Sequence, residues 1–173
     1  MDLLDFTKIR LERKEEKIQE VNLAEVAKGA IVTAQPFAIQ MDVNINLDVR
    51  SDVIIMADPD DMEIVFNNLI SNAVKYNKIG GKAEITIDES DGEAILIFTD
   101  TGIGISKNDT ENLFAEFVRI KNEKTRNISG SGLGLSIVKK VVELYHDTIN
   151  VDSTPDEGTV FTIRLPKKQI TIA

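Results

Sequence analysis

The chain has 173 residues, which suits a single folded domain, and 42 % of them are apolar, which predicts an ordinary buried core. It contains no cysteine, which excludes disulfides and zinc–thiolate sites, and its net charge of -9 opposes broad electrostatic binding to nucleic acid or to an anionic membrane. Its longest apolar runs are strand-sized and far short of the ~20 residues that cross a membrane.

The first 20 residues differ in composition from the rest of the chain. Residues 3–11 have apolar side chains at helix-like spacing, and residues 10–20 are heavily charged. We interpret this segment as the end of a helix that packs on a part absent from the chain, followed by a solvated linker. A frayed amphipathic terminus explains the same residues equally well.

A first helix is predicted after the linker. Asn22 and Glu25 form a capping pattern, and apolar residues keep helical spacing up to Pro36. Residues 41–49 then alternate apolar with polar, which predicts a half-buried strand, and residues 53–56 are predicted to be its short buried partner strand.

The second helix begins at Asp58 and Pro59, an N-cap followed by proline at the first helical position. At about 100° per residue, Asn68, Asn72 and Lys75 form a polar stripe beside its apolar face. Asparagine is a weak helix former, so this stripe suggests that the amides hold an oxygen-rich ligand with a hard cation. Surface asparagines on a solvated flank are the alternative.

The remaining strands are predicted at residues 83–88 and 94–99, joined by a hairpin turn, and at 149–151 and 159–165. A third long helix follows residues 130–135. Strand pairs interspersed with three long helices predict a two-layer α/β sandwich, with a mixed sheet and the helices on one face.

Asp100 follows a buried strand and precedes two glycines. A carboxylate held there could accept the exocyclic amine hydrogen of adenine, a contact that contributes about 1.5 to 3 kcal/mol. The same Asp-Thr-Gly triplet occurs in aspartic proteases, but their chemistry needs two carboxylates, and the chain has one such triplet.

The stretch 130–135 predicts a phosphate site, because glycines allow close backbone approach and the following helix directs its free N–H groups at the anion. A dinucleotide fold would need a strand just before the loop, and the preceding residues are polar; a P-loop sequence is absent. Glycines that only ease a loop into a helix are the alternative. Between the two glycine motifs, aromatic residues followed by cations predict a mobile lid: Phe114, Phe117, Arg119, Lys121, Lys124 and Arg126.

Taken together, these motifs resemble the catalytic, ATP-binding domain of two-component sensor histidine kinases, within the superfamily that includes gyrase, Hsp90 and MutL ATPases. NLISNAVKY at 68–76 is similar to the N box, DTGIG at 100–104 to the first glycine box, and LFAEF at 113–117 to the F box. GSGLGL at 130–135 is similar to the second glycine box, and GTVF at 158–161 to the late strand motif near the adenine.

The resemblance implies a Bergerat-type fold with an ATP lid, and ATP and Mg²⁺ as ligands. It assigns Asp100 to adenine, Asn72 and Asn68 to the metal and phosphate oxygens, and Lys75, Tyr76, Arg119 and Lys121 to the phosphates, with catalytic roles for Asn68, Lys75 and Arg119. The other nucleotide-binding residues that it implies are Gly102, Ile103, Gly104, Gly130, Ser131, Gly132, Leu133, Gly134, Leu135 and Thr159.

Asn68 stands where hydrolytic relatives carry a glutamate that activates water, which favours phosphoryl transfer to a protein nucleophile over hydrolysis. The family's phosphoacceptor histidine lies on a separate dimerising helix pair, and the sole histidine here, His146, is interpreted as a helix-end residue. Asp147 and Ala115 depart from the family's glycine and acid at their positions.

The implied organisation is the tail of a dimerisation helix with a linker at 1–20, the catalytic domain at 21–167 and a tail at 168–173. The chain would then be a fragment of a homodimeric, cytoplasmic kinase, whose anchoring in the inner membrane is left open. Its partners would be the histidine-bearing dimerisation domain and a response regulator receiver domain, with no nucleic acid and no direct membrane contact. A nucleotide-binding signalling module without catalysis and an anti-sigma-type serine kinase are the alternatives.

Overall fold

A computed structural model describes residues 17–115, 120, 122–126, 128 and 133–167. Its elements in chain order are β1 (Gln19–Asn22), α2 (Leu23–Gln40), β2 (Asn44–Val49), β3 (Ile54–Ala57), α3 (Pro59–Lys75), β4 (Lys82–Ser90), β5 (Glu93–Asp100), α4 (Lys107–Thr110), α5 (Gly134–Leu144), β6 (Ile149–Thr154) and β7 (Gly158–Pro166). None of the helices within these ranges has the length and hydrophobicity needed to span a bilayer.

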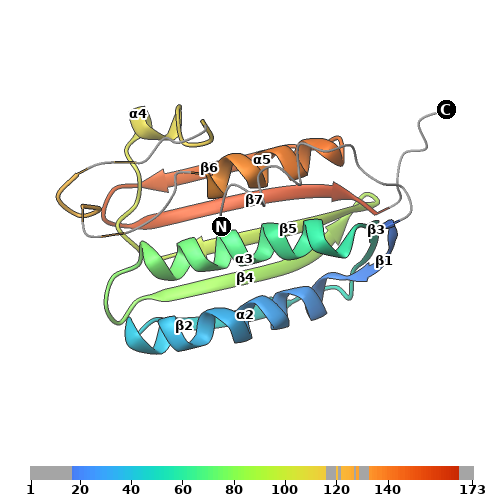
Figure 1. Cartoon of the computed structure of the whole chain (residues 1–173), viewed down its shortest axis with the longest axis horizontal. Helices are drawn as coiled ribbons and strands as arrows, with labels where there is room; N and C mark the ends of the chain where they lie inside the picture. The colour runs from blue at the N-terminus through green and yellow to red at the C-terminus, as the bar shows by residue number, and fades with distance from the viewer. Residues whose placement is uncertain (1–16, 116–119, 121, 127, 129–132, 168–173) are drawn as a thin grey trace.

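Two layers make up the fold. Five strands form one sheet in the order β2-β4-β5-β7-β6, in which β2 and β4 are parallel and the other neighbours are antiparallel. The helices α2, α3 and α5 lie side by side over one face of this sheet (Figure 1). The predicted two-layer sandwich with a mixed, mostly antiparallel sheet is therefore confirmed.

The pairing of β3 corrects one prediction. Residues 53–56 were expected to pair with the strand at 41–49, but β3 pairs antiparallel with β1, a strand that the sequence did not predict. The reason is that β2 ends where the N–H groups of Arg50 and Ser51 both donate to the Ile87 carbonyl oxygen, which turns the chain away from the sheet. Strand β1 also crosses the expected domain boundary after residue 20.

The first helix is longer than its sequence pattern predicted. Asn22 caps it as expected, accepting a hydrogen bond from the Glu25 N–H at 3.2 Å. The helix does not end at Pro36 but continues to Gln40. Proline has no N–H, so the carbonyl oxygen of Val32, four residues earlier, lacks its usual helical donor. Val32 is 73 % exposed, and its carbonyl can be hydrated instead.

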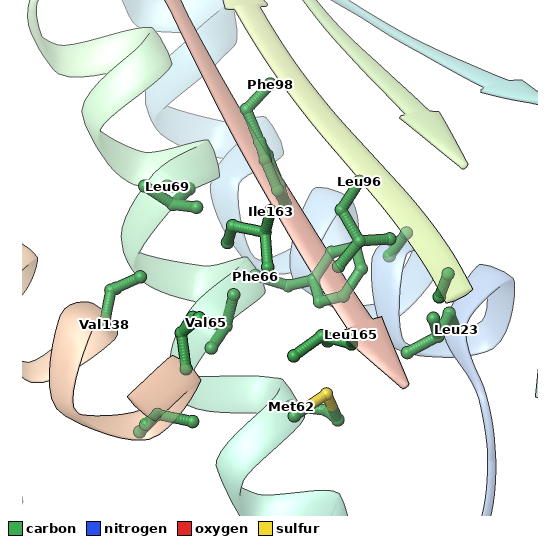
Figure 2. Close-up of a cluster of buried hydrophobic side chains, with 14 of the residues drawn as sticks. Leu23, Met62, Val65, Phe66, Leu69, Leu96, Phe98, Val138, Ile163 and Leu165 are labelled. Atoms are coloured by element: carbon green, nitrogen blue, oxygen red, sulfur yellow. The ribbon is translucent and has the colours of Figure 1, made fainter. Parts of the chain in front are cut away.

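The core lies between the helices and the sheet. Phe66 of α3 meets Phe98 of β5 edge to face, with ring centroids 5.4 Å apart. Side chains from α2, α3, α5, β5 and β7 converge around this pair in Figure 2, which labels Leu23, Met62, Val65, Phe66, Leu69, Leu96, Phe98, Val138, Ile163 and Leu165. The buried face of α3 thus fixes the helix rotation that leaves its polar stripe on the flank.

Candidate functional site

The predicted site residues gather at one end of the molecule. The C-terminal end of α3, the loop after β5, the short helix α4, the start of α5 and the turn between β6 and β7 all lie in the left half of Figure 1. These segments are far apart in the sequence, and their meeting follows from the strand order and the directions of the helices.

The asparagine stripe of α3 faces the start of α5. Asn68, Asn72 and Lys75 are all half-buried. The Asn68 side-chain amide donates to the Ile64 carbonyl oxygen at 2.6 Å, and a Cβ placed on Gly134 would lie 2.9 Å from Asn68 Oδ1. The amide oxygen of Asn68 is therefore directed at the N-terminal end of α5, where the second glycine motif continues into the helix.

The end of α3 carries a cation beside an aromatic ring. Lys75 Nζ lies 5.5 Å from the centroid of the Tyr76 ring, which suits a cation–π contact. Tyr76 is the C-cap, and its carbonyl oxygen accepts a hydrogen bond from the Ile103 N–H at 3.0 Å. The predicted residues Tyr76 and Ile103 are thus in direct contact, and Gly102 lies so close that an added Cβ would overlap the Tyr76 carbonyl oxygen.

Asp100 ends strand β5 with its carboxylate half-buried. The Gly102 N–H donates to Oδ1 at 2.8 Å, and the backbone of Thr159 makes a further hydrogen bond to the carboxylate. Burial raises the pKa of Asp100 from 3.8 to about 6, although both hydrogen bonds act in the opposite direction. A carboxylate that has lost part of its hydration is suited to accept an amine hydrogen from a ligand.

Glycines permit close backbone packing around Asp100. A Cβ on Gly158 would overlap the Asp100 carbonyl oxygen, and one on Gly104 would overlap the Thr154 carbonyl oxygen. Both glycines also have positive φ values, 129° and 66°. The first glycine motif is therefore needed for contact with the β6–β7 turn, in addition to any ligand that approaches it.

A pair of hydroxyl groups lies beside Asp100. Thr159 pairs with Asp100 in the β5–β7 register, and its Oγ1 is 2.8 Å from Ser153 Oγ. The Ser153 hydroxyl accepts a hydrogen bond from the Ile105 N–H and donates to the Gly158 carbonyl oxygen. Thr159 was predicted as a site residue; Ser153 was missed, because a lone serine in a strand carries no distinguishing pattern.

The start of α5 is the described part of the second glycine motif. Its N-cap residue, Leu133, is buried and provides no side-chain hydrogen bond to the first turn. Gly134 opens the helix, and the half-buried Leu135 follows it. First-turn N–H groups that lack a side-chain cap are suited to bind an anion. Three other predicted residues of this motif lie outside the described residues: Gly130, Ser131 and Gly132.

The predicted lid is described in part. Phe114 packs edge to face on Phe161 of β7, with centroids 6.3 Å apart, which joins the start of the lid to the sheet. Lys124 forms an ion pair with Asp156 in the β6–β7 turn. Three predicted lid residues, Phe117, Arg119 and Lys121, lie outside the described residues.

A turn within the lid is capped on both sides. Asn122 Oδ1 accepts a hydrogen bond from the Thr125 N–H at 3.1 Å, and Thr125 Oγ1 accepts one from the Asn122 N–H at 3.0 Å. This reciprocal arrangement is that of a capping box. It gives residues 122–125 a defined turn that holds Lys124 toward Asp156.

The donor set fits a magnesium ion bound through phosphates. Among the described residues, no group of three or more His, Asp or Glu side chains is placed to hold a metal ion. Asn68 and Asn72 nevertheless offer amide oxygens, and Mg²⁺ commonly uses few protein ligands together with waters and phosphate oxygens. A nucleotide would thus bring most of the metal's ligands.

Comparison with known proteins agrees with this geometry. Residues 57–169 match the family described as "Histidine kinase-, DNA gyrase B-, and HSP90-like ATPase". The chain is 31 % identical to the circadian input-output histidine kinase CikA of Synechococcus elongatus over 173 residues, covering 98 % of this chain and 23 % of that protein. It is 39 % identical to the sensor histidine kinase WalK of Bacillus subtilis over 120 residues, covering 68 % and 20 %.

Among solved structures, the catalytic domain of histidine kinase ThkA has a TM-score of 0.77 at 25 % identity, with 88 % of this chain and 97 % of that chain covered. ThkA in complex with the response regulator protein TrrA has a TM-score of 0.72 at 25 % identity, covering 87 % and 42 %. The chain spans about a fifth of the length of the curated relatives described above.

Proposed function

We propose, because the chain belongs to the family of histidine kinase-, DNA gyrase B- and HSP90-like ATPases, that it binds Mg-ATP and transfers the γ-phosphate to a histidine on a dimerisation domain outside this chain. Two relatives, CikA and WalK, are named histidine kinases. The observation that carries the proposal is the half-buried Asp100 carboxylate, at the same end of the fold as the asparagine stripe and the start of α5.

Adenine recognition is assigned to the end of β5. The Asp100 carboxylate would accept the exocyclic amine hydrogen of adenine, and this hydrogen bond is strengthened by the low polarity that raises the carboxyl pKa. Backbone hydrogen bonds from Gly102 and Thr159 hold the carboxylate in place. A base that lacks the amine would leave the carboxylate without this further hydrogen bond, so the site would favour adenine.

The phosphates are assigned to the space between the first turn of α5 and the polar flank of α3. The first turn of α5 presents N–H groups and the positive end of its dipole to an anion. Asn68 and Asn72 would hold the magnesium ion and phosphate oxygens, and Lys75 would neutralise phosphate charge from the end of α3. Bound Mg²⁺ would supply neutralisation of the charge that develops on the transferred phosphoryl group. Arg119 and Lys121, outside the described residues, are proposed to neutralise further phosphate charge.

Transfer is proposed in preference to hydrolysis because the described flank of α3 lacks a carboxylate that could activate water. Asn68 stands where hydrolytic relatives carry a glutamate, and an amide cannot take a proton from water at neutral pH. Glu63 is exposed on another face of the helix. A protein nucleophile such as histidine supplies its own lone pair, so it does not need this base.

The partners are proposed from the relatives. A structure of ThkA in complex with the response regulator protein TrrA supports a receiver domain as the next phosphate acceptor. The histidine acceptor would lie on the dimerisation domain of the same kinase, because the sole histidine of this chain, His146, follows α5 and is exposed. The parent protein is then a homodimer, with this catalytic domain in the cytoplasm.

Two measurements test this function. Calorimetric titration with Mg-ATP should give saturable binding that Asp100→Ala abolishes, whereas Asn72→Ala should weaken Mg-ATP more than free adenosine. Labelled ATP with a separately expressed dimerisation domain should then give acid-labile phosphohistidine. Binding without any phosphohistidine would indicate a nucleotide-binding signalling module, and unchanged ATP affinity in Asp100→Ala would contradict the site.

A further inference from the structure

Asn77 is a buried polar residue that no role above includes. It follows the C-cap of α3 and is 6 % exposed. Its side-chain amide donates to the carbonyl oxygens of Ala73 at 2.9 Å and Lys82 at 2.8 Å. Its Oδ1 accepts from the Lys78 N–H at 2.9 Å and from Thr101 Oγ1 at 3.2 Å. A carboxamide has two donors and two lone pairs, so all four are used.

These bonds join three segments of the proposed site. Ala73 lies in the last turn of α3, Lys82 begins β4, and Thr101 separates Asp100 from Gly102. Thr101 Oγ1 also accepts a hydrogen bond from the Lys82 N–H at 2.9 Å. The hydroxyl hydrogen has two acceptors within reach, Asn77 Oδ1 at 3.2 Å and the Lys82 carbonyl oxygen at 3.4 Å, and the contact with Asn77 is the shorter.

The orientation of Thr101 affects the position of Asp100 directly. The two residues share a peptide bond, and the next residue, Gly102, donates its N–H to the Asp100 carboxylate. A Cβ on Gly102 would overlap the Tyr76 carbonyl oxygen and lie 3.0 Å from Asn77 Cα, so this turn packs tightly on the end of α3. A change in the Thr101 contact would therefore move the donor that aims the carboxylate.

We propose that Asn77 is a positioning residue for adenine, which sets the direction of the Asp100 carboxylate through the Thr101 hydroxyl without touching the nucleotide. This inference rests on the proposed function, since it assigns the base-recognition step of the same site. It extends the role of the asparagine-rich end of α3 from binding phosphate to recognising the base.

Thr101→Val tests the proposal, because valine keeps the shape of threonine and removes the hydroxyl while Asn77 retains its bonds to Ala73 and Lys82. Titration calorimetry compares ADP with inosine diphosphate, which has an oxygen in place of the exocyclic amine. We expect Thr101→Val to weaken ADP by about 3- to 10-fold, as for the loss of one hydrogen bond, and to leave inosine diphosphate unchanged. Thr101→Ser, which restores the hydroxyl, should restore ADP affinity.

A merely structural role would weaken both nucleotides together, and that result, or an unchanged ADP affinity, would overturn the proposal. Asn77→Ser is the second variant, should valine prevent folding; its short side chain does not reach Thr101 and Lys82 together, so the same loss of selectivity is expected. If the wild-type protein bound neither nucleotide, the proposed function itself would be contradicted. This result differs from those that would contradict the positioning role of Asn77 alone.

Discussion

Replacing Asp100 by asparagine tests whether burial of the ionised carboxylate lowers the stability of the folded protein. The pKa of Asp100 in the folded protein is about 6, above the ordinary value of 3.8 that applies to the unfolded chain. The folded state therefore binds a proton more tightly, and the free energy of unfolding falls as the pH rises from about 4 to about 6. Above about pH 7 the full cost of the buried charge is present.

The size of the effect follows from this shift. One pKa unit corresponds to 1.36 kcal/mol, so ionised Asp100 costs the folded state about 2 to 3 kcal/mol at neutral pH. Asparagine has nearly the same shape, keeps an oxygen that accepts the Gly102 N–H, and carries no charge. Asp100→Asn should thus raise the free energy of unfolding by about 2 to 3 kcal/mol at pH 7.5 relative to its effect at pH 4, while weakening ADP by at least about tenfold.

Urea denaturation followed by far-ultraviolet circular dichroism, at a series of pH values, measures the difference between the two proteins. Asp88→Asn is a matched control of opposite sign, because hydrogen bonds from Glu89 and Ser51 lower the pKa of Asp88. That variant should lose stability at neutral pH, with the loss disappearing in acid. A difference between wild type and Asp100→Asn that does not change with pH would refute the reasoning, since burial would then impose no cost on the Asp100 charge.

Three further variants test the scaffold by the same urea assay. Gly29→Ala, in the exposed middle of α2 where an added Cβ meets nothing within 4 Å, should stabilise the protein by about 0.5 to 1 kcal/mol and leave ADP affinity unchanged. His146→Gly should add about 1 kcal/mol, because His146 has a φ of 61°, and it should leave phosphotransfer intact; loss of transfer would contradict its helix-end role. Tyr145→Phe should cost about 1 to 2 kcal/mol, since the Tyr145 hydroxyl donates to Asp61 at 2.7 Å and accepts from the Asp58 N–H; an unchanged midpoint would show that these bonds add nothing.

Local chemistry made most of the fold predictable. Asn22 and Asp58 cap α2 and α3 as their sequence patterns predicted, because a cap depends on residues within one helical turn. The predicted end of α2 was wrong, because the helix tolerates Pro36. Proline has no N–H to donate to the carbonyl oxygen of Val32, but this exposed carbonyl can bind water instead. The partner of β3 was also wrong, because strand pairing depends on β1, a short segment with little apolar alternation.

The candidate site was predictable where ligand chemistry leaves a compositional mark. Asp100 at a strand end and the asparagines of α3 conflict with ordinary propensity, and such conflicts are found where a site has a function. Asn77 was within the same asparagine-rich stretch, but its bonds to Lys82 and Thr101 depend on contacts between separate segments. Ser153 likewise becomes relevant only because the β6–β7 register places it opposite Thr159.

The glycines link the stability of the fold to the chemistry of the site. Gly102 and Gly158 let neighbouring backbone segments pack against Asp100, whose carboxylate loses part of its hydration, and Gly104 lets the loop after β5 pack on the β6–β7 turn. The same packing therefore lowers stability at neutral pH and strengthens any hydrogen bond that the carboxylate accepts. A bound adenine amine would offset part of the free energy that the ionised Asp100 costs the folded protein, and this offset would add to the affinity for the ligand.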